Sequence, residues 1–594
     1  ADKNVAIGYL ALSGDTLGNT SVAVGMGTLQ NQNFTTDTNS FNTALGHEAG
    51  NDITTGIQNT IVGGLAGDAL TDADNNVAMG YVALSTDTKG STAVAIGNSA
   101  LNSQNFTTAT SHYNVAVGSN AGASITTGVN NVFVGGLAGD ALTDADFNVA
   151  VGVAALTSDT LGSQSVAVGM NALTAQNMTT ATNALNTAVG HAAGAAVTTG
   201  IENTLIGGLA GDALTDADYN VAVGKSALSS DVRGSRAVAI GQSALAAQNF
   251  TTATTSYNVA VGDSAGLSIT TGVDNTLIGG LAGDAITDAD FNVAVGNSAL
   301  SANTVGSKNT AIGSSALLVM NPATATDSLN TAVGYHAGRL VSSGKEHTLI
   351  GGLAGDALTS GDRNVAIGTN ALSTDTQGSR NVAVGYDSLK TQNFTTGTNA
   401  YNVGVGYSAG SAITTGTGNH FFGSLSGTSC TTGSENVAVG GSTMGSATVT
   451  GSSNTAVGNA AMTSLSSGSN NTAIGHDAGR SGSPGGNITS GSNRFSLGDE
   501  NVSTLNAQVA LTVASDERDK TDFVDLDLGL DFIKALEPVT YYWDKRSKYG
   551  DKYAEDYDLN AQTPDGTHKE DWMDIGFKAQ AVRDLEEAAG YKAS

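Results

Sequence analysis

Asn4-Val-Ala-Ile-Gly8 is the first copy of a five-residue motif that returns throughout most of the chain. The motif reads Ser-Val-Ala-Val-Gly at Ser21–Gly25, Asn-Thr-Ala-Leu-Gly at Asn42–Gly46 and Asn-Thr-Ile-Val-Gly at Asn59–Gly63. Its closing glycines follow one another at spacings of 17, 21, 17 and 17, and this set of four recurs as a 72-residue superrepeat. Such a short and regular period predicts a solenoid, in which each coil buries its apolar surface only against its neighbours.

Each motif has the period-2 pattern of one short strand. The third position is usually alanine, as at Ala6 and Ala23, and the fourth is always apolar, as at Ile7 and Val24. Because adjacent residues of a strand point to opposite faces, both faces are apolar. One face can fill the interior of the coil. The other needs a covering layer, which we expect subunit association to supply, and its alanines suit a close approach.

The fourth motif of every superrepeat replaces the alanine with a large residue, which we expect to fill a wider space. The closing glycine fits a turn with positive φ or a close backbone approach. The opening asparagine can bond to the turn or stack as a ladder. The large residues are Ile61, Phe133, Leu205, Leu277, Leu349 and Phe421.

Composition narrows the function. The 594-residue chain has a net charge of −29, which argues against binding the phosphate backbone of nucleic acid or an anionic membrane. It has no run of 18 apolar residues, so we expect no membrane insertion. The single Cys430 excludes an intrachain disulfide framework. No motif predicts a cofactor. Residue 1 falls inside a repeat, and we therefore expect the N-terminus to be cut from a longer chain.

Repeat regularity and charge divide the chain into parts. The regular 72-residue superrepeat covers 1–440, and coils with less regular spacing follow over 441–498. We predict a linker at 499–514 and a small α+β domain at 515–594, which we expect to be incomplete. That last part holds 11 of the 24 Lys and Arg residues and both tryptophans, Trp543 and Trp572.

The 21-residue unit of each superrepeat adds four residues at one place. Insertions in a solenoid form loops on one side, which is often the binding side. An apolar residue at the tip of each loop either contacts a receptor or packs back onto its own coil, and local packing is favoured. These residues are Phe34, Phe106, Met178, Phe250 and Phe394, and the fifth superrepeat departs with Met320–Thr324.

A second recurring segment, Gly67–Asp74, carries three carboxylates. Asp68, Asp72 and Asp74 could offer oxygen ligands to a calcium ion. The spacing is not that of an EF-hand loop, and aspartates also close turns through their side chains. The turn role is favoured.

The repeats over about residues 4–498 resemble the head repeats of trimeric autotransporter adhesins. That resemblance implies a parallel β-roll in which three chains pack around one axis. The 17- and 21-residue coils are longer than is typical of those heads, and the β-barrel anchor that ends such adhesins is missing from the sequence.

The stretch Ser515-Asp-Glu-Arg-Asp-Lys520 resembles the start of the intramolecular chaperone domain of phage tail fibres and endosialidase-type tailspikes. Residues 528–544 and 575–582 also fit that pattern, although Ala581 stands where the family has glutamate. The resemblance implies trimer assembly and self-cleavage between Ala514 and Ser515. Ser515 would be the nucleophile. Lys520 would be its general base once burial favours the neutral amine.

We therefore predict an all-β protein, a trimeric parallel β-solenoid rod followed by an α+β chaperone domain. Its function would be that of a phage tail fibre: a homotrimer in the virion that binds a host surface receptor, such as a glycan, and other tail or baseplate proteins. No turnover enzyme is expected, only single-turnover autoproteolysis. The alternative is the head of a bacterial surface trimeric adhesin. A glycan-degrading tailspike is disfavoured, because residues 1–514 contain no tryptophan and their carboxylates recur with the repeat.

Overall fold

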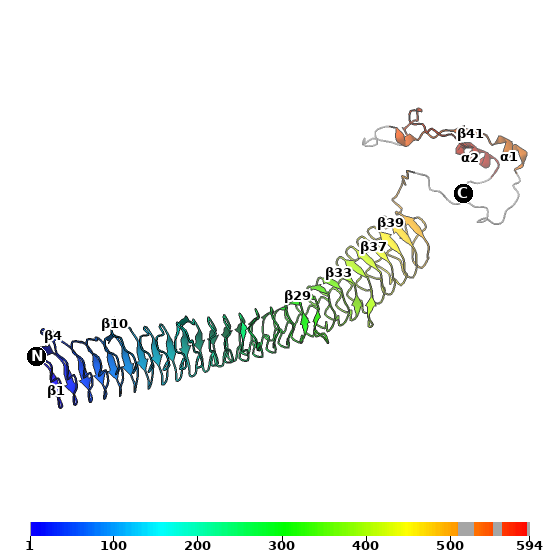
Figure 1. Ribbon diagram of the computed structural model, residues 1–594. Coiled ribbons are helices and arrows are strands. Elements are labelled where there is room, and N and C mark those ends of the chain that lie inside the picture. The colour runs from blue at the N-terminus through cyan, green and yellow to red at the C-terminus, as the bar shows by residue number, and fades with distance from the viewer. Residues whose placement is uncertain (1, 509–527, 550–560, 591–594) are drawn as a thin grey trace. The chain divides into compact units, whose positions relative to one another are not determined.

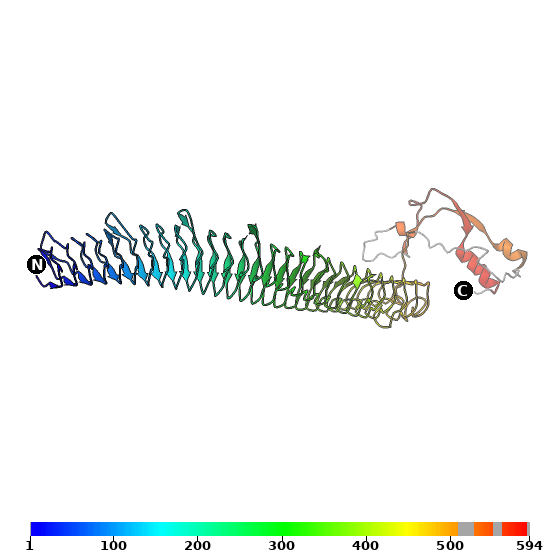
Figure 2. The ribbon, with the colours of Figure 1, turned by 60° about the horizontal axis from the view of Figure 1, so that its bottom comes forward.

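The computed structural model describes residues 2–508, 528–549 and 561–590 (Figure 1). The chain forms two compact units, Ala1–Ser503 and Thr504–Ser594. The first unit is a stack of coils, and Figure 2 shows the strands of successive coils aligned in one row.

The first unit is built on one parallel sheet of 28 strands. Each strand is the three residues before a closing glycine, so the repeat predicted every one of them. The strands are β1 (Val5–Ile7), β3 (Val22–Val24), β5 (Thr43–Leu45), β6 (Thr60–Val62), β7 (Val77–Met79), β9 (Val94–Ile96), β11 (Val115–Val117), β12 (Val132–Val134), β13 (Val149–Val151), β15 (Val166–Val168), β17 (Thr187–Val189), β18 (Thr204–Ile206), β19 (Val221–Val223), β21 (Val238–Ile240), β23 (Val259–Val261), β24 (Thr276–Ile278), β25 (Val293–Val295), β27 (Thr310–Ile312), β29 (Thr331–Val333), β30 (Thr348–Ile350), β31 (Val365–Ile367), β33 (Val382–Val384), β35 (Val403–Val405), β36 (His420–Phe422), β37 (Val437–Val439), β38 (Thr455–Val457), β39 (Thr472–Ile474) and β40 (Phe495–Leu497).

Six smaller sheets lie where the 21-residue coils carry their insertions. Each is a parallel pair of two-residue strands: β2 (Gly18–Asn19) with β4 (Thr38–Asn39), β8 (Gly90–Ser91) with β10 (Thr110–Ser111), β14 (Gly162–Ser163) with β16 (Thr182–Asn183), β20 (Gly234–Ser235) with β22 (Thr254–Thr255), β26 (Gly306–Ser307) with β28 (Thr326–Asp327), and β32 (Gly378–Ser379) with β34 (Thr398–Asn399).

Strands pair in register with the same motif positions of the next coil. Val5, Ala6 and Ile7, for example, lie opposite Val22, Ala23 and Val24. The predicted parallel β-solenoid of 17- and 21-residue coils is therefore confirmed.

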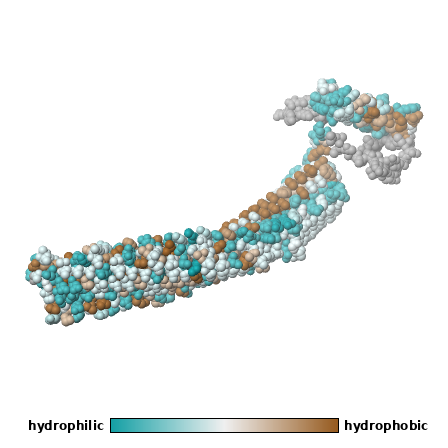
Figure 3. Space-filling view, in the orientation of Figure 1, coloured by the Kyte–Doolittle hydropathy of each residue, from teal (hydrophilic) through white to brown (hydrophobic). Residues whose placement is uncertain are grey.

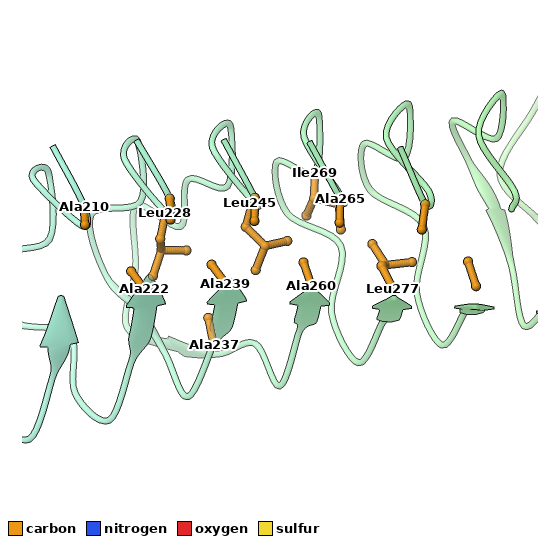
Figure 4. Close-up of a cluster of buried hydrophobic side chains, with 14 of the residues drawn as sticks. Ala210, Ala222, Leu228, Ala237, Ala239, Leu245, Ala260, Ala265, Ile269 and Leu277 are labelled. Carbon is orange, nitrogen blue, oxygen red and sulfur yellow. The ribbon is translucent and has the colours of Figure 1, made fainter. Parts of the chain in front are cut away.

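The motif alanines point into the coil, not toward a partner chain as we predicted. Ala222, Ala239 and Ala260 have no exposed surface and lie opposite apolar side chains such as Leu245 (Figure 4). The coil is too narrow for a large residue on both sides, so the strand contributes the small one. The alternating pattern identifies two faces but does not identify which of them is internal.

The large residues of the fourth motif do fill a wider part of the interior. Leu277 is fully buried, and two glycines, Gly266 and Gly283, lie against it. A Cβ on either glycine would approach a Leu277 methyl carbon to 2.8 Å. The space for the large side chain is therefore made by missing side chains.

The second and fourth motif positions form the outer face of the sheet. The fourth position is apolar in every coil, and several of its members, such as Ile278 and Ile474, are exposed in this single chain. Figure 3 shows apolar residues in a line along the coils that contain β37 and β39. The outer face thus carries a continuous apolar surface with no covering layer from its own chain.

Both predictions for the closing glycine hold. Gly63 has φ of +138°, and a Cβ there would lie 2.3 Å from the carbonyl oxygen of Gly80, the closing glycine of the next coil. Any side chain would therefore separate the two coils.

Both predictions for the asparagine hold as well. The Asn59 side-chain amide donates to the Ala73 carbonyl at 2.8 Å, which closes the turn. Its own backbone N–H donates to the side-chain oxygen of Asn42 at 2.9 Å, one coil earlier. Repeated along the coils, these bonds form the asparagine ladder, which satisfies backbone groups that would otherwise be buried without partners.

His347 interrupts the asparagine ladder. Its Nδ1 accepts the Asn364 backbone N–H at 3.3 Å, while its Nε2 is buried with no hydrogen-bond partner. Burial lowers the pKa of His347 from 6.5 to about 4, because the charged imidazolium would lose its hydration.

The substitution His347→Asn should stabilise the protein in mild acid. The native histidine must stay neutral in the folded state. The folding stability of the wild type is therefore unaffected by protonation of this histidine above pH 6.5 and decreases as pH falls from 6.5 toward about 4. That difference corresponds to on the order of 3 kcal/mol. Thermal unfolding followed by circular dichroism should show a smaller decrease in the midpoint for the variant between about pH 7 and about pH 4. The exposed His191→Asn serves as control, and an equal decrease in all three proteins would contradict the prediction.

The second unit is a small α+β region, as predicted. It contains α1 (Gly529–Ala535), β41 (Pro538–Tyr541), the 3₁₀ turn η2 (Arg546–Lys548), β42 (Asp574–Phe577) and α2 (Ala579–Ala588). β41 and β42 pair antiparallel, with Val539 opposite Gly576. Among the described residues of the whole chain, no helix has the length and apolar character needed to cross a membrane.

Candidate functional site

The loops of the 21-residue coils were the predicted candidates for receptor binding. Their apolar tips are buried against their own coils, as the packing alternative proposed: Phe34, Phe106, Met178, Phe250 and Phe394 are at most 7% exposed. The threonines that follow them, such as Thr35 and Thr36, are exposed. A receptor role for these loops stays a prediction, and the tip side chains contribute to the interior.

A carboxylate holds each of these loops in place, and it is buried in every loop except the first, where Asp15 is half-buried. In the last regular superrepeat, Asp375 accepts the backbone N–H groups of Gly378 and Phe394, each at 3.0 Å. Its other oxygen accepts the Gln392 side-chain amide at 2.5 Å. The Gln392 carbonyl oxygen in turn accepts from Asn402 of the asparagine ladder at 2.9 Å. The buried charge is thus satisfied by three donors, which connect loop and ladder.

The fifth superrepeat changes three of these groups together. Asn303 replaces the aspartate, Met320 replaces the glutamine, and Pro322, which lacks an N–H, replaces the phenylalanine. Asn303 satisfies itself locally, because its amide donates to the Gly306 carbonyl at 2.7 Å and its oxygen accepts the Gly306 N–H at 2.9 Å. The charge is therefore absent where two of its donors are absent.

Gln392→Met should destabilise the protein by about 2–3 kcal/mol, because it leaves the buried Asp375 carboxylate short of a donor. Adding Asp375→Asn should recover much of that loss, as the natural Asn303 and Met320 pair indicates. Chemical denaturation of the two single variants and the double variant would measure the coupling. Strictly additive effects would show that the two side chains do not act as a unit.

The acidic segment Gly67–Asp74 does not gather its carboxylates into one site. Asp74 accepts the Ile57 backbone N–H at 2.8 Å and closes a turn, while Asp72 is exposed. Asp68 is half-buried, and burial raises the pKa of its carboxyl group. Asp74 therefore has the turn role that the sequence favoured, and the three residues do not form a metal-ligating cluster within the described chain.

Among the described residues one group of potential metal ligands does come together, and sequence reasoning missed it. His476 Nδ1 lies 3.2 Å from Asp477 Oδ2 and 3.7 Å from Asp499 Oδ2. Arg480 also pairs with Asp477. Asp499 belongs to the next coil, where the regular spacing has ended, and no repeat pattern predicts that neighbour.

The described part of the second unit contains a polar cluster around Asp544. The Tyr549 hydroxyl donates to that carboxylate at 2.8 Å, and the Gly566 backbone N–H donates to it at 2.9 Å. The Trp543 indole N–H donates to Asp574 of β42 at 2.8 Å. The predicted nucleophile Ser515 and base Lys520 lie outside the described residues.

The described part of the second unit buries little of its apolar surface in this single chain. None of its described residues is classed as buried, and α1 and α2 have no buried side chain. Ile575 of β42 is 80% exposed, and Trp572 and Phe577 are exposed beside it. These exposed apolar groups of the described residues are available for other surfaces to cover.

Comparison with known proteins assigns the second unit. Residues 515–591 match the family Peptidase_S74, described as the chaperone of endosialidase. No curated protein and no solved structure matches the chain. The family match begins at Ser515, the residue at which the resemblance placed the start of the domain. Residues 515–591 are thus an endosialidase-type chaperone segment, and its combination with a β-solenoid of 28 strands fits a tail-fibre-like protein.

Proposed function

We propose that three copies of this chain form a phage tail fibre, which attaches the virion to a host cell. The solenoid is the shaft, and the C-terminal segment is an intramolecular chaperone that brings the chains together. The observation that carries the proposal is the chaperone match at 515–591 beside a solenoid whose outer face is apolar.

Apolar surface in both units supports assembly. The outer face of the 28-stranded sheet exposes Ile and Val side chains along the shaft, and the second unit exposes its tryptophans. Association of copies would remove both surfaces from water and stabilise the fibre by roughly 25 cal/mol per Å² of apolar area. A chaperone that gathers three chains before the coils align would also prevent pairing of exposed sheet edges with wrong partners.

Repetition supports attachment as the task of the shaft. Five of the six superrepeats present the same threonine-rich loop, and three chains would multiply it. Weak contacts to a repetitive host surface, such as a glycan layer, then sum to firm binding. The fibre would act outside the host cell, bound to other tail or baseplate proteins.

The Ser515→Ala chain, which should keep its full length, should sediment with the mass of three chains. One chain has a mass of 59.1 kDa, and the apolar outer face should keep copies together at low concentration. Sedimentation equilibrium measures this mass directly. A single-chain mass at all concentrations would contradict the proposed assembly.

Self-cleavage should remove residues 515–594 from freshly expressed chain. The Ser515 hydroxyl would attack the Ala514 carbonyl carbon while Lys520 takes its proton and passes it to the Ser515 nitrogen, so that the amide bond breaks and an ester forms between Ala514 and Ser515 Oγ. Water would then hydrolyse that ester, which leaves the Ala514 carboxylate and a free Ser515 hydroxyl and separates the two parts of the chain. Intact-mass spectrometry should find the shortened chain in the wild type and the uncut chain in Ser515→Ala and Lys520→Ala. Lys534→Ala, a change elsewhere in the segment, should still be cut. Equal masses in all four proteins would remove the cleavage step and leave the fibre proposal in place.

A further inference from the structure

Two columns of residues border the outer face of the sheet. The leading column consists of the residue before each motif, such as Tyr113 before Asn114. The trailing column consists of the residue after each closing glycine, such as Tyr9 after Gly8. Contacts between successive coils show that each is a continuous row. In the leading column Arg236 lies 4.7 Å over the Tyr219 ring, and in the trailing column the Tyr386 and Tyr407 rings stack at 5.5 Å.

The trailing column contains glycines that neither the backbone conformation nor the packing within the chain requires. They do not have a positive φ, and a Cβ at any of them would have no heavy atom closer than 3.5 Å. At Gly352 nothing at all lies within 4 Å. This contrasts with the closing glycine beside each of them, which backbone geometry requires. The glycines recur once in each of the first five superrepeats: Gly64, Gly136, Gly208, Gly280 and Gly352.

The leading column contains large exposed residues at the same period. Tyr113 is 59% exposed, and its φ of 54° is a left-handed conformation that costs a residue with a Cβ about 1 kcal/mol. The series is aromatic or leucine throughout, and each member lies one coil before a trailing-column glycine or, in the last case, Ser424. Its members are Phe41, Tyr113, Leu185, Tyr257, Leu329 and Tyr401.

In a cyclic assembly of parallel chains, one margin of each sheet meets the opposite margin of the next copy. The leading column of one chain would therefore face the trailing column of its neighbour. We propose that copies pack through the outer face with an offset of one coil, so that each large leading-column side chain occupies the gap at a trailing-column glycine of the neighbouring copy. The inference rests on the proposed assembly of three chains and adds its contact surface and register.

Charge supports the same offset independently of size. When each leading-column residue faces the trailing-column residue of the next coil in the neighbouring copy, Glu202 faces Lys225 and Arg236 faces Asp263. All four side chains are exposed, and Glu202, Lys225 and Asp263 have no ion-pair partner among the described residues of their own chain. Neither pair forms when each leading-column residue faces the trailing-column residue of the same coil.

The reverse offset is disfavoured. It would place Arg236 opposite Lys225 and Asp274 opposite Asp263, two like-charge pairs that repel. Size alone fits both offsets, because Phe147, Tyr219 and Phe291 lie one coil after trailing-column glycines. The charge pairs therefore select the register, and the second and fourth motif positions lie between the two columns.

Disulfide trapping tests the register in the full chain. Tyr113→Cys with Gly136→Cys should form interchain disulfides, giving a covalent trimer on a non-reducing denaturing gel. A disulfide requires Cα atoms within about 4.4–6.8 Å, which separates adjacent coils from more distant ones. The same-coil pair, Tyr113→Cys with Ser119→Cys, is the matched control. Cys430 is buried, with its pKa raised to about 12, and the wild type measures any background from it.

A pair of glycine variants tests the gap. Gly352→Trp meets no atom within its own chain, so the coil should keep its strand circular dichroism while the trimer dissociates at lower temperature. Gly397→Trp lies in an insertion loop and also has no neighbour within 4 Å, and it should leave the trimer unchanged.

The outcomes separate the two proposals. A wild-type chain that sediments as a monomer would overturn the proposed function. A wild-type trimer that crosslinks through the same-coil pair, or that tolerates Gly352→Trp as well as Gly397→Trp, would overturn this inference alone.

Discussion

The close approach of one closing glycine to the next is the constraint on which the solenoid depends. At Gly63 the neighbouring carbonyl oxygen occupies the position that a Cβ would need. This contact keeps the coils in one register, and the in-register strands then place each asparagine where it can accept the backbone N–H of the next coil. The interior follows from that alignment, because alanine on the strand side leaves room for a leucine on the other.

The sequence was sufficient to predict the strands, the glycine turns and the asparagine ladder, because the motif repeats all three together. It was also sufficient to favour buried tips for Phe34 and its equivalents. It predicted the wrong strand face for the alanines, because an alternation with a period of two does not distinguish the inside of the coil from the outside. The link from Asp375 to Gln392 was not predicted, because these partners are 17 residues apart and meet only when coils stack. The loosened spacing near Asp499 likewise concealed its contact with His476.

The two units divide the physical work of the chain. The solenoid buries a row of small and large side chains within each copy, and its stability grows with every added coil. The chaperone segment has no buried residue among those described, so its exposed apolar groups are available to other surfaces. The match of that segment to the endosialidase chaperone favours a fibre over the head of a surface adhesin, which the repeats alone would also fit. In the proposed fibre, attachment would belong to the solenoid and the gathering of chains to the chaperone segment.

The coils are alike in backbone but not interchangeable, because Leu277 needs the facing Gly266 and Gly283, and each buried aspartate needs the glutamine of the following coil. A deletion or duplication of one coil would place a leucine against an alanine or a carboxylate against no donor. Length can therefore change without loss of packing only by whole superrepeats, each of which adds about 19 Å of shaft at the usual strand spacing. Evolution of this shaft would proceed in discrete steps, and related fibres should differ in reach by multiples of that step.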